Sequence, residues 1–149
     1  MAYRAAVVGG SGYTGAELLR LLAAHPEIEV VHVTADSNAG AAVGALYPSL
    51  AAAYPAVEYA SYAPADLAGV DMALVALPHG ESQLIATALV ERVGHVVDLG
   101  ADFRLPAGVY ERWYGQPHTA PDLLDGFAFG LPELFADVVA RGPHVAAPG

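Results

Sequence analysis

Two kinds of segment alternate along the chain. Short, nearly uninterrupted apolar runs are typical of strands buried in a parallel sheet, whereas longer segments carry apolar residues at helical spacing. This alternation predicts an α/β fold, a doubly wound and mostly parallel sheet with helices on both faces, similar to a Rossmann fold. The predicted strands are residues 3–8, 29–34, 71–76, 95–99 and 144–147, and the predicted helices are 16–24, 41–46, 81–91 and 107–114.

Two of these segments carry more specific expectations. Residues 30–33 show little polar alternation, which predicts an interior strand covered on both sides. Residues 39–64 are rich in alanine, tyrosine and proline, and they predict a surface excursion with one short strand near 57–59. At 149 residues, the chain has the size of one domain.

A glycine-rich string, GGSGYTG at residues 9–15, stands between the first strand and the first helix. Strand, glycine turn and helix in this order are the setting of a dinucleotide fingerprint. Gly10 is expected to allow the tight turn, Gly12 to let a pyrophosphate approach the backbone, and Gly15 to let the helix pack closely. Backbone N–H groups and the positive end of the helix dipole then face the phosphates. The alternative is a glycine-rich turn that only links strand to helix.

The end of the second strand is where such folds read the adenosine ribose. Asp36 is spaced to accept a hydrogen bond from a 2′-hydroxyl, as in NAD sites, and it equally fits a solvated loop aspartate. Ser37 and Asn38 are alternative donors to a 2′-phosphate, but no arginine stands beside them. The spacing by itself leaves NAD and NADP open.

Further polar residues follow the carboxyl ends of later strands. Pro78, His79 and Gly80 come after the strand at 71–76, on the predicted functional edge, although His79 also fits an exposed turn. Arg104 follows the strand at 95–99, where a guanidinium is able to clamp phosphate or carboxylate. An ion pair of Arg104 with Asp98 or Asp102 is the ordinary alternative.

Composition narrows the function classes. The formal net charge is −10, and all six basic residues are arginines, so nucleic-acid binding and a lysine-dependent P-loop are not expected. With no cysteine and with scattered histidines, no disulfide, thiolate or metal site is expected. No apolar run is long enough for a spanning helix and no secretory leader is visible, which predicts a cytoplasmic protein without membrane contact.

Five motifs together resemble the N-terminal half of the N-acetyl-γ-glutamyl-phosphate reductases of arginine biosynthesis. The resemblance covers all 149 residues. The first motif is shared with many dinucleotide folds, but the combination in this order is specific. The motifs are GGSGYTGAELLRLLAAHP at 9–26, ALPHG at 76–80, DLGADFRL at 98–105, GLPEL at 130–134 and VAAPG at 145–149.

The resemblance implies NADPH-dependent reduction of N-acetyl-glutamyl 5-phosphate to the 5-semialdehyde, with release of phosphate. In the family, a cysteine thiolate attacks the acyl phosphate. That cysteine follows the proline-glycine pair that corresponds to Pro148 and Gly149, so no catalytic residue is expected within this chain. The 149 residues then form the dinucleotide-binding domain, and a C-terminal catalytic domain that also joins the subunits of a homo-oligomer lies outside them.

Position by position, the resemblance assigns site residues. Arg104 matches an arginine expected to hold the substrate phosphate. Ala35 and Asp36 stand where many members have serine and arginine, which weakens the NADP assignment and leaves NAD open, and Ala147 replaces a frequent asparagine. The matched cofactor-binding residues are Ser11, Gly12, Tyr13 and Thr14 in the glycine string, Ser37 after the second strand, and Pro78 and Gly80 in the nicotinamide-side loop.

Two other functions remain open on the sequence. One is a related reductase that acts on a carrier-linked glutamyl or aminoadipyl phosphate in lysine biosynthesis. The other is a non-catalytic NAD(P)-binding regulatory module. An apolar patch is expected where a missing domain docks on an enzyme half, but not on a module complete at this length.

Overall fold

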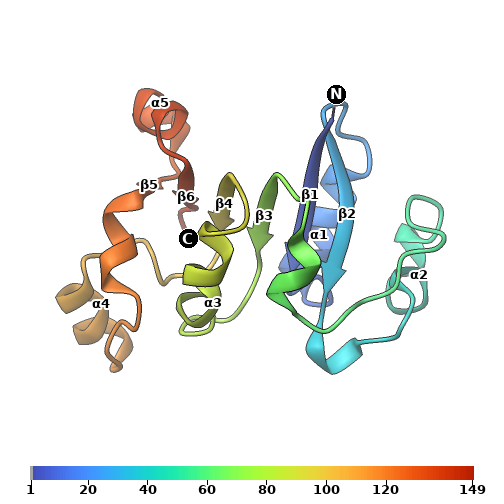
Figure 1. Ribbon diagram of the computed structural model, residues 1–149, viewed down its shortest axis with the longest axis horizontal. Coiled ribbons are helices and arrows are strands. Elements are labelled where there is room, and N and C mark those ends of the chain that lie inside the picture. Colours follow the sequence, from blue (N-terminus) through green and yellow to red (C-terminus); the bar gives the residue numbers. More distant parts are fainter. Residues whose placement is uncertain (1) are drawn as a thin grey trace.

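Six parallel strands form a sheet at the centre of the structure, a computed structural model that describes residues 2–149 (Figure 1). The strands lie in the order β2-β1-β3-β4-β6-β5, and every neighbouring pair is parallel. The predicted parallel α/β architecture is therefore confirmed. The strands are β1 (Tyr3–Val8), β2 (Ile28–Thr34), β3 (Met72–Val75), β4 (His95–Asp98), β5 (Phe127–Phe129) and β6 (His144–Ala146).

Helices and short 3-10 turns connect the strands. The helix predicted at residues 107–114 has those bounds, whereas the first helix begins at Tyr13 rather than at residue 16. Within residues 2–149, none of the helices has both the length and the apolar character needed to cross a bilayer. The helices are α1 (Tyr13–Leu22), α2 (Val43–Leu46), α3 (Ser82–Val90), α4 (Ala107–Tyr114) and α5 (Pro132–Arg141), and the 3-10 turns are η1 (Asp36–Asn38), η2 (Pro48–Leu50), η3 (Pro64–Leu67) and η4 (Pro121–Gly126).

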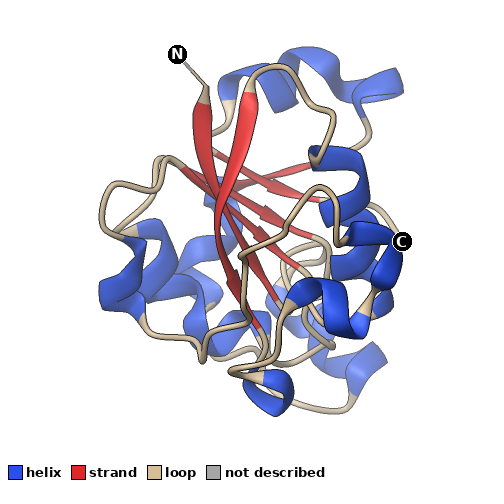
Figure 2. Cartoon of the chain, turned by 90° about the vertical axis from the view of Figure 1, so that its right-hand side faces the viewer, coloured by secondary structure: helices blue, strands red, loops and turns tan. Residues whose placement is uncertain are grey.

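Helices cover both faces of the sheet, as a doubly wound fold requires (Figure 2). The side chains of β1 alternate between the two layers, because successive residues of a strand point to opposite faces. Ala5 and Val7 pack in the cluster that contains Leu19 of α1. Ala6 and Val8 pack in the opposite cluster, which contains Leu89 of α3. The sheet is thus buried on both sides, which explains the nearly continuous apolar runs.

The prediction of β2 as an interior strand is wrong, because β2 forms one edge of the sheet. On one face, its apolar residues are covered by the segment 41–60, which folds beside it (Figure 1). Ala60 N donates to Val33 O and Ala35 N donates to Ala60 O, both at 2.9 Å. Residues 41–60 are therefore not a surface excursion: Val43 and Tyr59 are fully buried, and we refer to 41–60 as the cover segment.

The sequence analysis assigned no strand or helix to residues 127–141, which form β5 and α5. β5 has three residues and pairs with β6 at the far edge of the sheet. α5 follows after Gly130 and Leu131, and it contains no buried residue. A strand this short gives little periodic signal, whereas α5 does carry apolar residues at helical spacing, a pattern that the sequence analysis did not use.

Candidate functional site

The carboxyl ends of β1 and β3 mark the place where the strand order changes direction. From β1 the chain passes to β2 on one side, and it then crosses β1 to form β3 on the other side. In open α/β sheets, ligands bind in the crevice outside such a switch point. The glycine string leaves the sheet here, directly after Val8, and α1 begins at Tyr13.

The turn after β1 is made by Gly9, not by Gly10 as the sequence suggested. Gly9 has a φ of +82°, a conformation that favours glycine. Its N–H and that of Gly10 donate to the carbonyl of Thr34 at 3.1 and 2.8 Å. Gly10 and Gly15 are required by packing instead. A Cβ on Gly10 would collide with the Val33 side chain, and one on Gly15 would collide with the backbone of Gly9 and Gly10.

Gly12 differs from these glycines because the space in front of it is open. A Cβ there would have only Gly9 O within 4 Å, at 3.7 Å. Gly12 is the N-cap of α1, and in the described chain no side chain caps this end and no acidic residue occupies the first turn. The first N–H groups of α1 and the positive end of its dipole are thus free to receive an anion. These features fit a pyrophosphate.

Two pockets flank the glycine string. The first, which we call the β2 pocket, has a volume of about 150 Å³, and the second, the β3 pocket, about 320 Å³. Two pockets on either side of an uncapped helix N-terminus have the arrangement that the two nucleoside halves of a dinucleotide require. The β2 pocket is lined by Val8, Gly9, Thr34, Ala35, Asp36, Tyr62, Leu77, Glu81, Leu84 and Ile85, and the β3 pocket by Gly12, Tyr13, Thr14, Ala76, Leu77, Pro78 and Leu99.

Some of the predicted cofactor-binding residues line these pockets, whereas Gly10, Ser11, Gly15 and Gly80 line neither. Tyr13 and Thr14, from the first turn of α1, meet Pro78, from the loop after β3, in the β3 pocket. Asp36 lines the β2 pocket, and its Oδ1 accepts a hydrogen bond of 3.1 Å from Tyr62 N. Ser37 lines neither pocket, and its Oγ accepts from the Asn38 side chain at 3.2 Å. Asp36 is thus the polar side chain from η1 that faces the first pocket.

The loop that contains Pro78 and Gly80 is held from beneath by Asp102. The Asp102 carboxylate is fully buried, and it accepts hydrogen bonds from Gly80 N at 2.7 Å, Ser82 Oγ at 2.8 Å and Gln83 N at 3.0 Å. Tyr110 Oη adds a fourth bond at 3.0 Å. Asp102 therefore holds in place both this loop, which we call the β3 loop, and the start of α3. The sequence analysis did not assign this role to it.

A second buried carboxylate, Asp98, adjoins this network. Its Oδ2 lies 3.1 Å from Ser82 Oγ, and its Oδ1 accepts from Gly100 N at 3.0 Å. Burial raises the pKa of Asp98 to about 6, and the nearby charge of Asp102 adds to the rise, whereas the bonds from Gly100 and Ser82 oppose it. A hydroxyl has one proton, so Ser82 donates to only one carboxylate at a time. Protonated Asp98 is able to donate to Ser82 while Ser82 donates to Asp102.

Arg104 contacts backbone carbonyls. Its Nε donates to Ala147 O at 2.7 Å and its Nη2 donates to Leu99 O at 2.8 Å. Neither Asp98 nor Asp102 forms an ion pair with it among residues 2–149, so that alternative is wrong. Arg104 also lines a different pocket from the glycine string, of about 330 Å³, together with residues of η4. It therefore links the end of β4 to the turn that follows β6.

Sequence reasoning missed the residues that support the site. The hydroxyl of Tyr47 donates to Ser11 O across 36 residues of sequence, at 2.8 Å. Asp102 and Ser82 are separated by 20 residues. The sequence offered one signal for the role of Asp102, namely its position just after a strand. It lies in the motif at 98–105, in which Arg104 was chosen as the candidate site residue instead.

Comparison with known proteins agrees with this geometry. The family described as semialdehyde dehydrogenase, NAD binding domain, matches residues 4–141. N-acetyl-γ-glutamyl-phosphate reductase from Pseudomonas fluorescens (strain Pf0-1) is 44% identical over 96% of this chain and 42% of its own length. The reductase from Nitrosococcus oceani is 44% identical over 98% of this chain and 43% of its own length. The chain thus spans less than half the length of these curated relatives.

Solved structures show the same fold. Aspartate semialdehyde dehydrogenase II from Vibrio cholerae, complexed with ASA, aligns with 100% of this chain and 42% of its own, at a TM-score of 0.67 and 16% identity. Aspartate semialdehyde dehydrogenase with NADP from Candida albicans aligns with 70% of this chain and 31% of its own, at a TM-score of 0.59 and 20% identity. At such identities, the likeness concerns the fold.

Proposed function

Because the chain belongs to the semialdehyde dehydrogenase family, whose NAD-binding domain it contains, we propose that it is the dinucleotide-binding part of a reductase of arginine biosynthesis. The full-length protein reduces N-acetyl-glutamyl 5-phosphate to N-acetyl-glutamate 5-semialdehyde and releases phosphate. Similarity to curated reductases over 96% of the chain supports this substrate. The proposal places the reaction in the cytoplasm.

The open N-terminus of α1 at the switch point is the observation that carries the proposal. Ser11, Tyr13 and Thr14 would hold the pyrophosphate through backbone N–H groups, and the uncovered side of Gly12 gives it room. Gly10 and Gly15 keep the loop and α1 close enough for this. The bound coenzyme supplies a hydride to the substrate carbonyl when the reduction occurs.

The β3 loop would place the nicotinamide half. Pro78 lines the β3 pocket, and Gly80 is held at a φ of +90° by its bond to Asp102. Its left-handed backbone disfavours any residue with a side chain, and a Cβ would lie 2.5 Å from Gln116 Nε2. A loop fixed in this way keeps a planar ring in one orientation, which is the condition for stereospecific hydride transfer.

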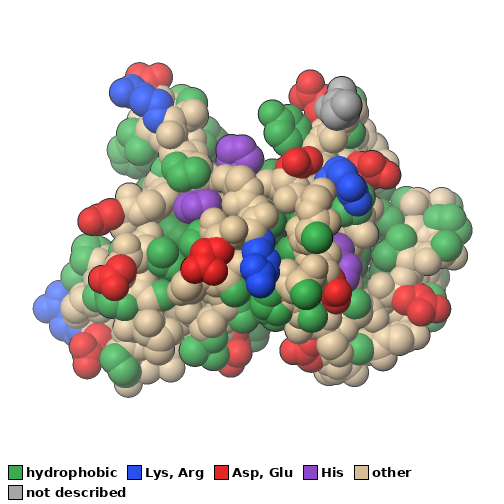
Figure 3. Space-filling model, viewed as in Figure 1, with side chains coloured by type: hydrophobic (Ala, Val, Ile, Leu, Met, Phe, Trp, Pro, Cys, Tyr) green, Lys and Arg blue, Asp and Glu red, His purple; other side chains and the backbone are tan. Residues whose placement is uncertain are grey.

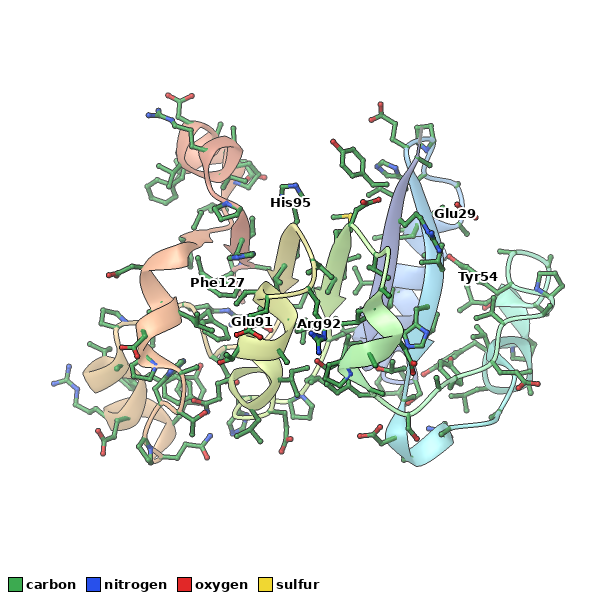
Figure 4. The ribbon with its side chains drawn as sticks, viewed as in Figure 1. Glu29, Tyr54, Glu91, Arg92, His95 and Phe127 are labelled. Carbon is green, nitrogen blue, oxygen red and sulfur yellow. The ribbon has the colours of Figure 1, made fainter. Side chains whose placement is uncertain are left out.

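The coenzyme that the resemblance implies is NADP(H), with NAD(H) kept open by Asp36. Ser37 and Asn38 are neutral donors near the 2′-position, whereas Asp36 and Glu81 bring two carboxylates to the β2 pocket. Of the six arginines, all of which are described, none lines this pocket. Arg92, which is labelled in Figure 4 and follows α3, is not among the residues that line it.

Arg104 would serve the substrate side. Its bonds to Leu99 and Ala147 use Nε and Nη2, which leaves Nη1 for the acyl phosphate or for released phosphate. The same bonds fix the turn at residues 147–149, after which the family has its cysteine nucleophile. Arg104 thereby joins substrate binding to the place where the thiolate is expected.

The remainder of the protein would dock against α5 and β5. Four apolar residues of β5 and α5 are exposed here, as is typical of an interaction surface. They are Phe129, Leu134, Phe135 and Val138, which expose 40, 72, 43 and 54% of their surface. In the space-filling view, hydrophobic side chains gather around this projecting end of the molecule (Figure 3). We assign this surface to the C-terminal part that the longer relatives have, and we assign oligomer contacts to that same part.

Two measurements test the proposal. The purified 149-residue chain should bind NADPH or NADH in a calorimetric titration, and no binding of either would overturn the assignment of the site. The full-length protein should oxidise the reduced coenzyme when given N-acetyl-glutamyl 5-phosphate. Turnover only with a carrier-linked glutamyl or aminoadipyl phosphate would instead favour the lysine-biosynthesis reductase.

A further inference from the structure

Tyr47 connects the cover segment to the glycine string. It follows α2 at the carboxyl end of that helix, and its hydroxyl donates to the carbonyl of Ser11 at 2.8 Å. Ser11 immediately precedes Gly12, the N-cap of α1. A residue 36 positions away in the sequence thus touches the backbone where the pyrophosphate would bind.

The bond fixes the orientation of one peptide group. In a planar trans peptide, the carbonyl and the following N–H point in opposite directions. The carbonyl of Ser11 is held by Tyr47, and the N–H of Gly12 donates to Gly9 O at 3.3 Å. The peptide between Ser11 and Gly12 is therefore held at both ends.

The orientation matters because a carbonyl oxygen and a phosphate repel each other. With Tyr47 in place, the Ser11 oxygen is drawn toward the cover segment and away from the open end of α1. Without the hydroxyl, this peptide keeps only the bond from Gly12 N to Gly9 O, and a rotation that breaks this weaker bond would turn the Ser11 oxygen toward the phosphate site. The negative end of the peptide dipole would then oppose the positive end of the helix dipole.

We propose that Tyr47 is a positioning residue of the dinucleotide site, whose hydroxyl locks the Ser11–Gly12 peptide in the orientation that receives a pyrophosphate. This inference rests on the proposed function. Tyr47 contacts the loop and not the coenzyme, so it acts through the backbone that it holds.

The cover segment holds the Tyr47 backbone firmly enough for this role. Tyr47 N donates to Val43 O, and Leu50 N donates to Tyr47 O, both at 2.9 Å. Val43 is fully buried, and its N–H donates to Val57 O at 2.9 Å. Residues on both sides of Tyr47 are thus anchored in the core.

The chain offers a matched control in Tyr54. Its hydroxyl donates to the carbonyl of Leu19 in α1 at 2.7 Å, the same kind of bond from the same cover segment (Figure 4). Leu19 lies in the body of α1 and not at its open end. Loss of the Tyr54 hydroxyl therefore removes an equivalent bond without releasing the glycine string.

The test compares Tyr47→Phe with Tyr54→Phe in the 149-residue chain. Calorimetry with NADPH and with NADH is expected to give a Kd about five- to tenfold higher for Tyr47→Phe, which is the effect of one hydrogen bond. Tyr54→Phe should bind within about twofold of the wild type, although both variants should unfold at lower urea concentrations. Adenosine, which lacks a pyrophosphate, should not discriminate Tyr47→Phe from the wild type.

Two results would overturn the inference. One is an unchanged dinucleotide Kd for Tyr47→Phe, and the other is an equal loss in both variants, which would indicate a general stability effect. If Tyr47→Phe is partly unfolded, all three proteins are measured in trimethylamine N-oxide, which favours the folded state. If the wild type binds neither dinucleotide, the proposed function itself fails, whereas equal binding by wild type and Tyr47→Phe refutes only the role of Tyr47.

Discussion

Ser82 Oγ lies 2.8 Å from Asp102 Oδ2, and this hydrogen bond joins the start of α3 to the loop that follows β4. The same carboxylate holds Gly80 N, so the two loops of the β3 pocket share one support. A buried carboxylate that accepts four hydrogen bonds holds the surrounding segments in place, because its loss would leave several buried donors without partners. The position of the loop after β3 thus depends on a residue that does not line the β3 pocket.

The first prediction concerns this support. Asp102→Ala should lower the free energy of unfolding by about 3–5 kcal/mol, because Gly80 N, Gln83 N and Tyr110 Oη lose their acceptor, whereas Ser82 keeps Asp98. Asp102→Asn keeps the shape and one acceptor oxygen, and it should cost about half as much. Urea unfolding measures both. Equal stability of Asp102→Ala and wild type would show that the network does not hold the loops.

The second prediction concerns pH. Because the folded pKa of Asp98 is about 6, above the ordinary value of 3.8, folding favours its protonated form. Its contribution to stability is therefore complete below about pH 4 and is lost as the pH rises to about 6. The free energy of unfolding should fall across this range by up to about 3 kcal/mol, at roughly 1.4 kcal/mol for each unit of pKa.

Asp98→Asn provides the comparison for this pH effect, since an amide keeps hydrogen bonds to Gly100 and Ser82 without titrating. The difference in unfolding free energy between wild type and Asp98→Asn should change between pH 4 and pH 6 and stay constant from pH 7 to 8. A difference that is flat from pH 4 to 8 would contradict a raised pKa for Asp98.

The third prediction separates two glycines of the same string. Gly12→Ala should change the free energy of unfolding by less than about 1 kcal/mol, because its Cβ has room, but it should weaken dinucleotide binding at least tenfold by filling the pyrophosphate space. Gly15→Ala should destabilise the fold by about 1–3 kcal/mol or more, because its Cβ would collide with the loop backbone. Calorimetry and urea unfolding on both variants check this. Normal binding by Gly12→Ala would move the pyrophosphate elsewhere.

The fourth prediction concerns coenzyme choice. Asp36→Arg should lower the ratio of the NADPH Kd to the NADH Kd by about tenfold or more, because a guanidinium pairs with the 2′-phosphate where a carboxylate repels it. Asp122→Arg makes the same charge change on η4, away from the β2 pocket, and should leave the ratio unchanged. An equal shift in both variants would mean that net charge, and not the β2 pocket, sets the ratio.

The sequence by itself determined most of the local elements. Apolar runs predicted β1, β3, β4 and β6 to within a residue or two, because strands buried on both faces of a parallel sheet consist almost entirely of apolar residues. Helical spacing of apolar residues predicted α4. The glycine string located the open end of α1, because strand, glycine turn and helix follow one another along the chain. The motif set also led to the family.

Tertiary structure alone decided what depends on contacts between distant residues. It placed β2 at the edge of the sheet under a cover segment, and it gave Asp102 and Tyr47 their partners 20 and 36 residues away. It also turned Arg104 toward two backbone carbonyls, whereas the sequence had left open a bound anion or an ion pair with Asp98 or Asp102. The physical reason is that hydrophobic periodicity reports the burial of a residue within its own element, whereas a hydrogen-bond partner is chosen by the topology that brings two elements together.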